Sequence, residues 1–141
     1  MVICDRYAFS GVAFSASKGI PGLTYEWCRA PDVSLPAPDL TIFLDVSPDK
    51  AADRGGFGEE RYEKEEMQLR VRDIFERIGM ELGEGERGSW LPIDADMEKD
   101  EVAELVWKAV EPLSKGLAGP LQKLWDDHNE RLKDRALQLY T

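Results

Sequence analysis

One stretch constrains the fold more than any other. Residues 40–46 (Leu-Thr-Ile-Phe-Leu-Asp-Val) are nearly continuous in apolar side chains, as expected of a strand that is covered on both faces. Strands of this kind belong to parallel sheets with helices on their faces. Two more strands are predicted over residues 2–4 and 89–95, and the proline at position 92 favours an edge position for the second of these.

Amphipathic segments alternate with the predicted strands. Helices are predicted over residues 8–18, 22–29, 47–54, 59–82 and 102–113, and from position 120 onward. Three prolines between residues 30 and 39 predict a rigid loop. The order predicts α/β layering on a parallel sheet. Three strands are few for an open sheet that is covered on both faces, which indicates that part of the sheet is missing.

Composition and charge narrow the class of protein. The chain has 141 residues, of which 43% are hydrophobic, and this fits one domain with a real core. Its formal net charge of -10 makes non-specific binding to a nucleic-acid polymer or an acidic membrane unexpected. Cys4 and Cys28 show no metal-type spacing, and no signal peptide or membrane span is apparent. We therefore expect a soluble intracellular protein, cytoplasmic or nuclear, with reduced thiols.

The run Asp5-Arg6-Tyr7 follows the first predicted strand. Open α/β sheets bind ligands at the carboxyl ends of their strands. The forked donors of Arg6 suit phosphate oxygens, and Asp5 could hold Arg6 or approach Mg²⁺ through water. From these three residues alone, a purely structural Asp–Arg pair is an equal alternative.

Three longer segments carry a resemblance to a known family. They are residues 5–14 (Asp-Arg-Tyr-Ala-Phe-Ser-Gly-Val-Ala-Phe), residues 27–40 with their Ala-Pro-Asp and Pro-Ala-Pro-Asp runs, and residues 54–63 (Arg-Gly-Gly-Phe-Gly-Glu-Glu-Arg-Tyr-Glu). In that order they closely resemble the signature, the next segment and the lid of eukaryotic-type thymidylate kinases. The resemblance runs from residue 2 to about Val110, and the tail after Gly116 is matched only near Leu124-Trp125.

The resemblance implies a fold and a reaction. The fold is α/β, of the three-layer P-loop-kinase type with a parallel sheet, here incomplete because N-terminal strands and the phosphate loop are absent. Residues 1–116 would form a partial thymidylate kinase-like domain with a lid at about 54–66, and residues 117–141 a C-terminal helical extension. The reaction is phosphoryl transfer from ATP to dTMP with Mg²⁺, giving ADP and dTDP. Members of the family are commonly homodimers.

The resemblance also assigns roles around Arg6. Arg6 would clamp the dTMP phosphate and the transferring group, and Asp5 would orient Arg6 or lie near the metal. Ser10, Gly11 and Phe14 would line the thymidine pocket, since glycine lets a ligand approach the backbone closely. Core packing is the plain alternative for Phe14.

Further roles fall on the lid and on the last strand. Tyr62 would pack near the deoxyribose, and Arg54 would lie over the adenine. Arg61 would approach the ATP phosphates as the lid closes. Arg6, Asp5 and Arg61 are the expected catalytic residues. Asp94 and Ala95 match the place where the family's adenine pocket closes. Solvated helix-end charge is the alternative for the two lid arginines, and core packing for Tyr62.

One expected motif does not occur. No G-x-x-x-x-G-K-[ST] run is present, although in this family such a loop wraps the ATP phosphates with backbone N–H groups. By resemblance, a missing strand would lie between those of residues 2–4 and 40–46, leaving two strand edges unpaired. We therefore expect the chain to be inactive by itself.

Two other interpretations stay open. One is a non-catalytic remnant, acting at most as a nucleotide-binding or interaction module. The other is a deoxynucleoside kinase, which shares the Asp/Glu-Arg pair at a strand end. The Ala-Phe-Ser-Gly run at residues 8–11 and the Arg-Tyr-Glu of the lid argue against this last interpretation.

Overall fold

A computed structural model describes residues 1–47, 49–51, 61–83 and 89–126 of the chain, with the backbone alone at 61–65 and 89. The elements, in chain order, are α1 (Ala8–Ala16), α2 (Tyr25–Arg29), the 3₁₀ turn η1 (Ala30–Asp32), β1 (Leu40–Asp45), α4 (Arg61–Leu82), β2 (Ser89–Asp94), α5 (Lys99–Val110) and the 3₁₀ turn η2 (Glu111–Lys115). Residues 49–51 are also helical. No helix in these ranges is long and apolar enough to cross a membrane.

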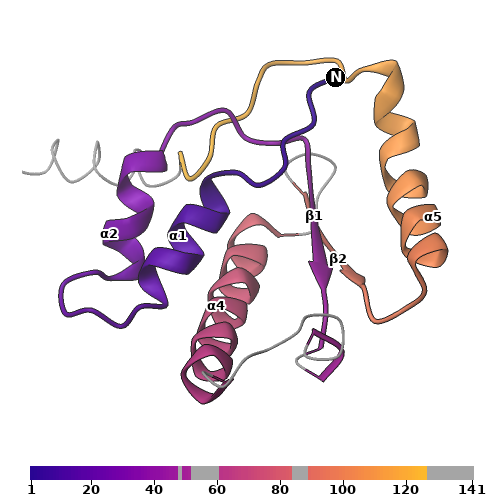
Figure 1. Ribbon diagram of the computed structural model, residues 1–141. Coiled ribbons are helices and arrows are strands. Elements are labelled where there is room, and N and C mark those ends of the chain that lie inside the picture. Colours follow the sequence, from indigo (N-terminus) through magenta and orange to yellow (C-terminus); the bar gives the residue numbers. More distant parts are fainter. Residues whose placement is uncertain (48, 52–60, 84–88, 127–141) are drawn as a thin grey trace, which may run out of the picture.

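The two strands form a parallel sheet with helices on both faces. β1 and β2 pair from Leu40 opposite Ser89 to Asp45 opposite Asp94. Parallel neighbours need a crossover connection, and α4 lies within it. Figure 1 shows α1, α2 and α4 on one side of the sheet and α5 on the other. The predicted α/β layering around a parallel sheet is therefore confirmed.

Aromatic side chains fill the space between the sheet and α4. Phe43 of β1 stacks on Trp90 of β2, with ring centroids 5.4 Å apart, and Phe75 of α4 lies 5.0 Å from Phe43. Phe9 of α1 meets Trp90 edge-on at 5.8 Å. Such pairs add about 0.5–1.5 kcal/mol each beyond their burial. The core thus fastens α1 to the sheet through Phe9, close to the Asp5-Arg6 run.

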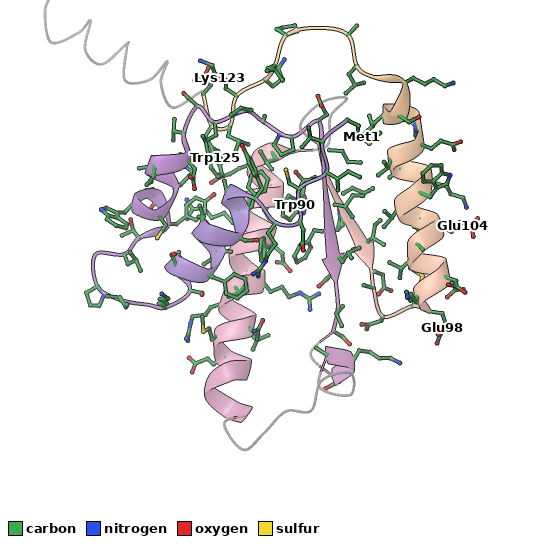
Figure 2. All side chains as sticks on the ribbon, turned by 45° about the horizontal axis from the view of Figure 1, so that its top comes forward. Met1, Trp90, Glu98, Glu104, Lys123 and Trp125 are labelled. Atoms are coloured by element: carbon green, nitrogen blue, oxygen red, sulfur yellow. The ribbon has the colours of Figure 1, made fainter. Side chains whose placement is uncertain are left out.

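The helix on the opposite face is held more lightly. α5 begins with a capping box in which Glu98 and Glu101 bond each other's backbone, which satisfies N–H groups at the helix start. Figure 2 shows Glu98 and Glu104 at the outer side of α5, away from the aromatic core. None of the residues of α5 is fully buried, although Ile93 beneath it on β2 is only 5% exposed.

The strand predicted over residues 2–4 is wrong. These residues form no regular element, and Val2 and Ile3 are 88% and 83% exposed. A strand needs a neighbour to pair its backbone N–H and C=O groups. Within the described ranges β1 pairs only with β2, so the apolar run at residues 2–4 has no strand beside it.

The helix predicted from Pro120 is also wrong over its described part. Residues 120–126 form an isolated antiparallel bridge, Pro36 with Lys123, followed by a turn. Leu124 and Trp125 are only 1% and 6% exposed. Backbone N–H and C=O groups of the proline-rich loop form hydrogen bonds with residues 122 and 124. Backbone groups that pair with this loop do not pair within a helix. Residues 127–141, and most of the predicted lid, lie outside the described residues.

Candidate active site

The site begins at Arg6, immediately before α1. Its backbone lies in the left-handed region, with φ 69°, which is strained for a residue with a side chain. Its guanidinium carbon lies 5.0 Å from the centroid of the Phe14 ring. A cation over an aromatic face is worth about 0.5–1 kcal/mol at an exposed position. Arg6 and Asp5 are both exposed, so a ligand can reach them.

The first turns of α1 bring the expected substrate residues together. Phe14 and Ser10 are one turn apart on the same helix face, and both are half-buried. Phe14 meets the edge of Phe75 at 6.5 Å. A Cβ built at Gly11 would have no heavy atom within 4 Å, so this stretch of helix backbone is open to a ligand. Four of the residues predicted for dTMP therefore lie on α1 or just before it, and Arg6 contacts Phe14 directly.

A second group forms at the carboxyl ends of the strands. Asp45 ends β1 opposite Asp94, which ends β2. The Arg72 Nη2 donates to Asp45 Oδ2 at 2.5 Å, and both side chains are about one-third exposed, at 35% and 30%. The Ala95 N–H donates to the Asp45 carbonyl at 2.7 Å. Acidic residues at both strand ends are thus present, and one of them is already paired with a cation.

The loops that follow these strands are tied to each other. The Ser47 N–H donates to Asp96 Oδ1 at 2.9 Å, and the Asp96 N–H donates to Asp94 Oδ1 at 2.9 Å. Ala95 is buried, with 6% exposed, and its N–H is used by the sheet. Of the two residues at the end of β2 predicted to border the adenine, only Asp94 therefore presents an exposed side chain.

Helix α4 joins the two groups. Phe75 contacts Phe14 on α1 and Phe43 on β1, while Arg72, nearly one turn earlier, reaches Asp45. The lid residues predicted for ATP and deoxyribose fall largely outside the description. Arg54 lies outside the described residues, and Arg61 and Tyr62 are placed only as the first backbone positions of α4.

Sequence reasoning missed Arg72 and Asp45. Asp45 ends the most apolar strand as Asp94 ends the next one, but Asp94 was predicted from the resemblance to the family's adenine pocket and Asp45 had no such match. Arg72 had no comparable signal, because it sits among many charged residues along α4. Its neighbour Arg70, also missed, donates from Nε to the Ser17 carbonyl at 2.8 Å and so fastens α4 to the end of α1.

The chemistry of the first group suits an anion that carries a flat ring. Arg6 supplies forked donors for phosphate oxygens, Phe14 an apolar wall, and Gly11 an open backbone. Across the described ranges, no three His, Cys, Asp or Glu residues gather as a metal cage. The exposed carboxylate of Asp5 fits a Mg²⁺ ion held mainly by substrate phosphates and water, which is how this ion usually binds beside nucleotides.

Comparison with known proteins points to one family. The thymidylate kinase family model matches residues 1–106. Thymidylate kinase of Schizosaccharomyces pombe is 53% identical over 100 residues, covering 71% of this chain and 46% of the relative. That of Arabidopsis thaliana is 42% identical over 126 residues, covering 88% and 44%, and that of Homo sapiens is 38% identical over 125 residues, covering 88% and 56%.

A solved structure agrees with the sequence relatives. Thymidylate kinase of Candida albicans superposes with a TM-score of 0.64 at 26% identity, covering 84% of this chain and 58% of that one. The P-loop-kinase type of fold predicted from the sequence is thus confirmed for the part present. This chain spans about half the length of the curated relatives that it matches. On the match of the family model over residues 1–106 and on relatives that are 38–53% identical, the chain belongs to the thymidylate kinase family.

Proposed function

We propose that this chain provides the dTMP-binding part of a dTMP kinase, which transfers a phosphoryl group from ATP to dTMP and yields ADP and dTDP. One observation carries the proposal: the Arg6 guanidinium lies on the Phe14 ring beside the open backbone of Gly11. A phosphate clamp, an apolar wall and a space for close approach are together what a thymidine monophosphate requires. Such substrates would place the protein inside the cell, in the cytoplasm or the nucleus.

Phosphoryl transfer needs little covalent work from the protein. Catalysis comes from positioning and from positive charge on the phosphoryl oxygens. In the proposal Arg6 leaves the Phe14 ring to clamp the dTMP phosphate and the transferring group, and Asp5 orients Arg6. Phe14 and Ser10 then line the pocket of the thymine base.

The remaining roles fall to the lid and to the end of β2. Tyr62 packs against the deoxyribose, Arg54 covers the adenine, Arg61 approaches the ATP phosphates, and Asp94 with Ala95 borders the adenine. Asp5 would be the residue nearest a Mg²⁺ ion bound with ATP, and such an ion would supply positive charge to the phosphate oxygens. The homodimer expected of the complete family protein stays a prediction.

In the proposal the backbone cradle for ATP comes from outside these 141 residues, since no G-x-x-x-x-G-K-[ST] run occurs among them. We therefore propose that the chain by itself binds dTMP and turns over no ATP. The alternative is a nucleotide-binding or interaction module without catalysis. That alternative is favoured by a sheet of only two strands over the described residues.

The first test is binding of dTMP to the chain by isothermal titration calorimetry. Arg6→Ala removes the proposed clamp and should weaken binding at least about tenfold, since hydrogen bonds to charged groups contribute roughly 1.5–3 kcal/mol. Lys108→Ala is the matched control: it also removes one positive charge, but on exposed α5, where the lysine pairs only with Glu104 in the described part of the chain. Equal binding by the wild type and both variants would contradict the role of Arg6.

The second test is turnover. ADP formation is measured with ATP, Mg²⁺ and dTMP, with TMP and dUMP as comparison substrates. We expect no turnover from the folded chain alone. dTMP-dependent turnover would show that another segment of these residues holds the ATP phosphates, and absence of both turnover and dTMP binding would favour the module without a nucleotide site.

A further inference from the structure

The chain's tail is hydrogen-bonded to a loop far away in the sequence. We call residues 122–126 the tail segment, and it runs antiparallel to residues 34–37 with Pro36 opposite Lys123. Three backbone hydrogen bonds join them: Ser34 N–H to the Leu124 carbonyl at 2.9 Å, Leu124 N–H to the Leu35 carbonyl at 2.8 Å, and Ala37 N–H to the Gln122 carbonyl at 2.8 Å. The tail segment is thus held as an added short strand.

This pairing directs two apolar side chains into the core. Leu124 is 1% exposed and Trp125 is 6% exposed. The Trp125 ring meets Phe9 edge-on, with centroids 5.7 Å apart, and Trp90 meets the same Phe9 edge-on at 5.8 Å. Trp125 and Trp90, both labelled in Figure 2, therefore share contact with one residue of α1. Phe9 therefore contacts both the tail segment and the sheet.

Backbone strain gathers around this assembly. Over the described ranges, the residues other than glycine with positive φ are Arg6 (69°), Ser34 (69°) and Trp125 (53°). Ser34 Oγ also donates to Asp126 Oδ1 at 2.9 Å. Such conformations persist only where the surroundings determine them closely, and they cluster at functional sites. Two of the three strained residues belong to the tail pairing, and the third is the proposed phosphate clamp.

The connection from the tail segment to Arg6 is short. Tyr7, the next residue, donates from its hydroxyl to the Pro36 carbonyl at 2.9 Å, and Pro36 is the bridge partner of Lys123. Phe9, three residues after Arg6, is the contact of Trp125. Residues 1–5, which precede Arg6, are exposed. The residues that follow Arg6 are joined to the tail segment by the hydrogen bond of Tyr7 to Pro36 and by the ring contact of Phe9 with Trp125.

We propose that Trp125 is a positioning residue for Arg6. The tail segment fixes Tyr7 through Pro36 and Phe9 through Trp125, and these two anchors keep Arg6 in its left-handed conformation at the start of α1. The inference rests on the proposed function only in taking Arg6 as the phosphate clamp. Its structural part, the dependence of the start of α1 on Trp125, can be measured without any nucleotide.

Hydrogen exchange followed by mass spectrometry tests the structural part on the 141-residue chain. We expect Trp125→Ala to speed exchange of the amides in residues 8–14 at least about tenfold relative to those in α5 of the same molecules. Trp107→Ala is the matched control, because this tryptophan is 59% exposed on α5. Trp107→Ala should leave residues 8–14 unchanged. Uniform acceleration of all protected amides, or none, would overturn the proposal.

Trp125→Phe is a second variant for the case that Trp125→Ala does not fold. The smaller ring can still contact Phe9, so we expect a local acceleration of only about threefold in residues 8–14. If Trp125→Ala does not fold, this variant decides the question. Acceleration confined to residues 8–14 supports the proposal, and a uniform or absent effect overturns it.

Calorimetric titration with dTMP tests the link to Arg6. If Trp125 acts through Arg6, Trp125→Ala weakens dTMP binding about tenfold in the wild-type background and less than about threefold in the Arg6→Ala background. Equal losses in both backgrounds would show that Trp125 acts on stability alone and would overturn the positioning role. If the wild type binds no dTMP, the proposed function fails, and the exchange measurement still decides whether Trp125 fixes the start of α1.

Discussion

Two glycines of this chain stand in helices for different reasons. Gly79 in α4 lies against the sheet, and a Cβ there would come within 2.7 Å of Trp90 Cδ1 and 2.8 Å of Trp90 Nε1. Trp90 is only 9% exposed and is stacked on Phe43, so it has little room to move. At this position glycine is required by packing between helix and sheet.

Gly79→Ala should therefore destabilise the protein. Alanine gains roughly 1 kcal/mol of helix propensity, but overpacking a tight core costs about 1–3 kcal/mol and here displaces an aromatic stack. Because the stack leaves Trp90 little room, we expect a cost in the upper part of that range, about 2–3 kcal/mol, and so a net loss of about 1–2 kcal/mol in the free energy of unfolding, measured by urea denaturation. Unchanged stability would mean that Trp90 moves aside freely.

Gly11→Ala is the matched change without a packing conflict. Since nothing lies within 4 Å of its Cβ position, we expect stability to rise by up to about 1 kcal/mol through helix propensity alone. Under the proposed function we also expect the affinity for dTMP to fall at least about tenfold, because the new methyl group lies where the ligand would contact the backbone. Calorimetric titration and urea denaturation of one preparation separate the two effects. If the variant were stabilised and still bound dTMP with wild-type affinity, Gly11 would not be part of the binding site.

Among the elements, α2 and α4 are joined by a polar cluster around Glu81. Its Oε2 accepts from the Tyr25 hydroxyl at 2.7 Å and from Arg29 Nη1 at 3.0 Å, and its Oε1 accepts from Arg77 Nε at 3.3 Å. Arg77 in turn bonds Glu26 at 2.7 Å and covers the Tyr25 ring, with its guanidinium carbon 3.7 Å from the centroid. This cluster fixes the carboxyl-terminal end of α4.

Glu81→Gln tests how much this cluster contributes. The substitution keeps the shape and removes the charge that Arg29 and Arg77 share. We expect a loss of about 1–2 kcal/mol, because hydrogen bonds to charged groups contribute roughly 1.5–3 kcal/mol and this site is partly open to solvent. Glu104→Gln on α5, which breaks only an exposed pair with Lys108, is the control and should change stability by less than about 0.5 kcal/mol. Equal effects of the two variants in urea denaturation would contradict the role of Glu81.

The same cluster predicts a response to alkaline pH. Burial, and then the hydrogen bond to Glu81, raise the pKa of Tyr25 well above its usual range. The folded state therefore favours the neutral phenol, so this contribution to stability is fully present below the ordinary tyrosine pKa of about 10 and is lost as the pH rises above it. We expect the free energy of unfolding to fall between about pH 10 and 11, and to fall less in Tyr25→Phe. If the free energies of unfolding of the two proteins, measured by urea denaturation, fell equally steeply with pH, this prediction would be wrong.

The elements show which sequence signals suffice. The helix predicted over residues 8–18, the described part of the helix predicted over residues 59–82 and the strand predicted over residues 40–46 are confirmed. The two helices carry apolar residues at helical spacing, and the strand carries a nearly continuous apolar run. The strand predicted over residues 2–4 is wrong because strand pairing depends on a neighbouring strand and not on local propensity alone. The helix predicted from residue 120 is wrong over its described part for a similar reason. Leu124 and Trp125 fit a helical stripe, but the loop at residues 34–37 supplies backbone hydrogen-bond partners that the sequence does not reveal.

For the candidate site, local motifs carried prediction only part of the way. The run at residues 5–14 is short, and Arg6 contacts Phe14 of the helix that follows it, while the predicted roles of these residues in binding stay predictions. The pairing of Asp45 with Arg72 joins a strand to a helix 27 residues away, and no local pattern indicates it. The positive φ of Arg6 is likewise set by distant contacts.

At the scale of the whole molecule, apolar side chains are exposed on β1 and on the residues that precede α1. Within the described part of the chain β1 has a strand on one edge only, Leu44 is 50% exposed, and Val2 and Ile3 are almost fully exposed. An unpaired strand edge with apolar side chains is a template for pairing with another chain. The isolated chain should therefore self-associate through β1 unless another segment covers this edge.

Leu44→Lys tests this surface directly. A lysine on an edge strand opposes strand-to-strand pairing, and at an exposed site it should change stability by less than about 0.5 kcal/mol. We expect sedimentation velocity to show concentration-dependent association of the wild type, weakened at least about tenfold by Leu44→Lys. Met80→Lys, at a residue 80% exposed on α4, removes comparable apolar surface away from β1 and should leave association unchanged. A wild type that stays monomeric, or equal effects of the two lysines, would show that the β1 edge does not drive association.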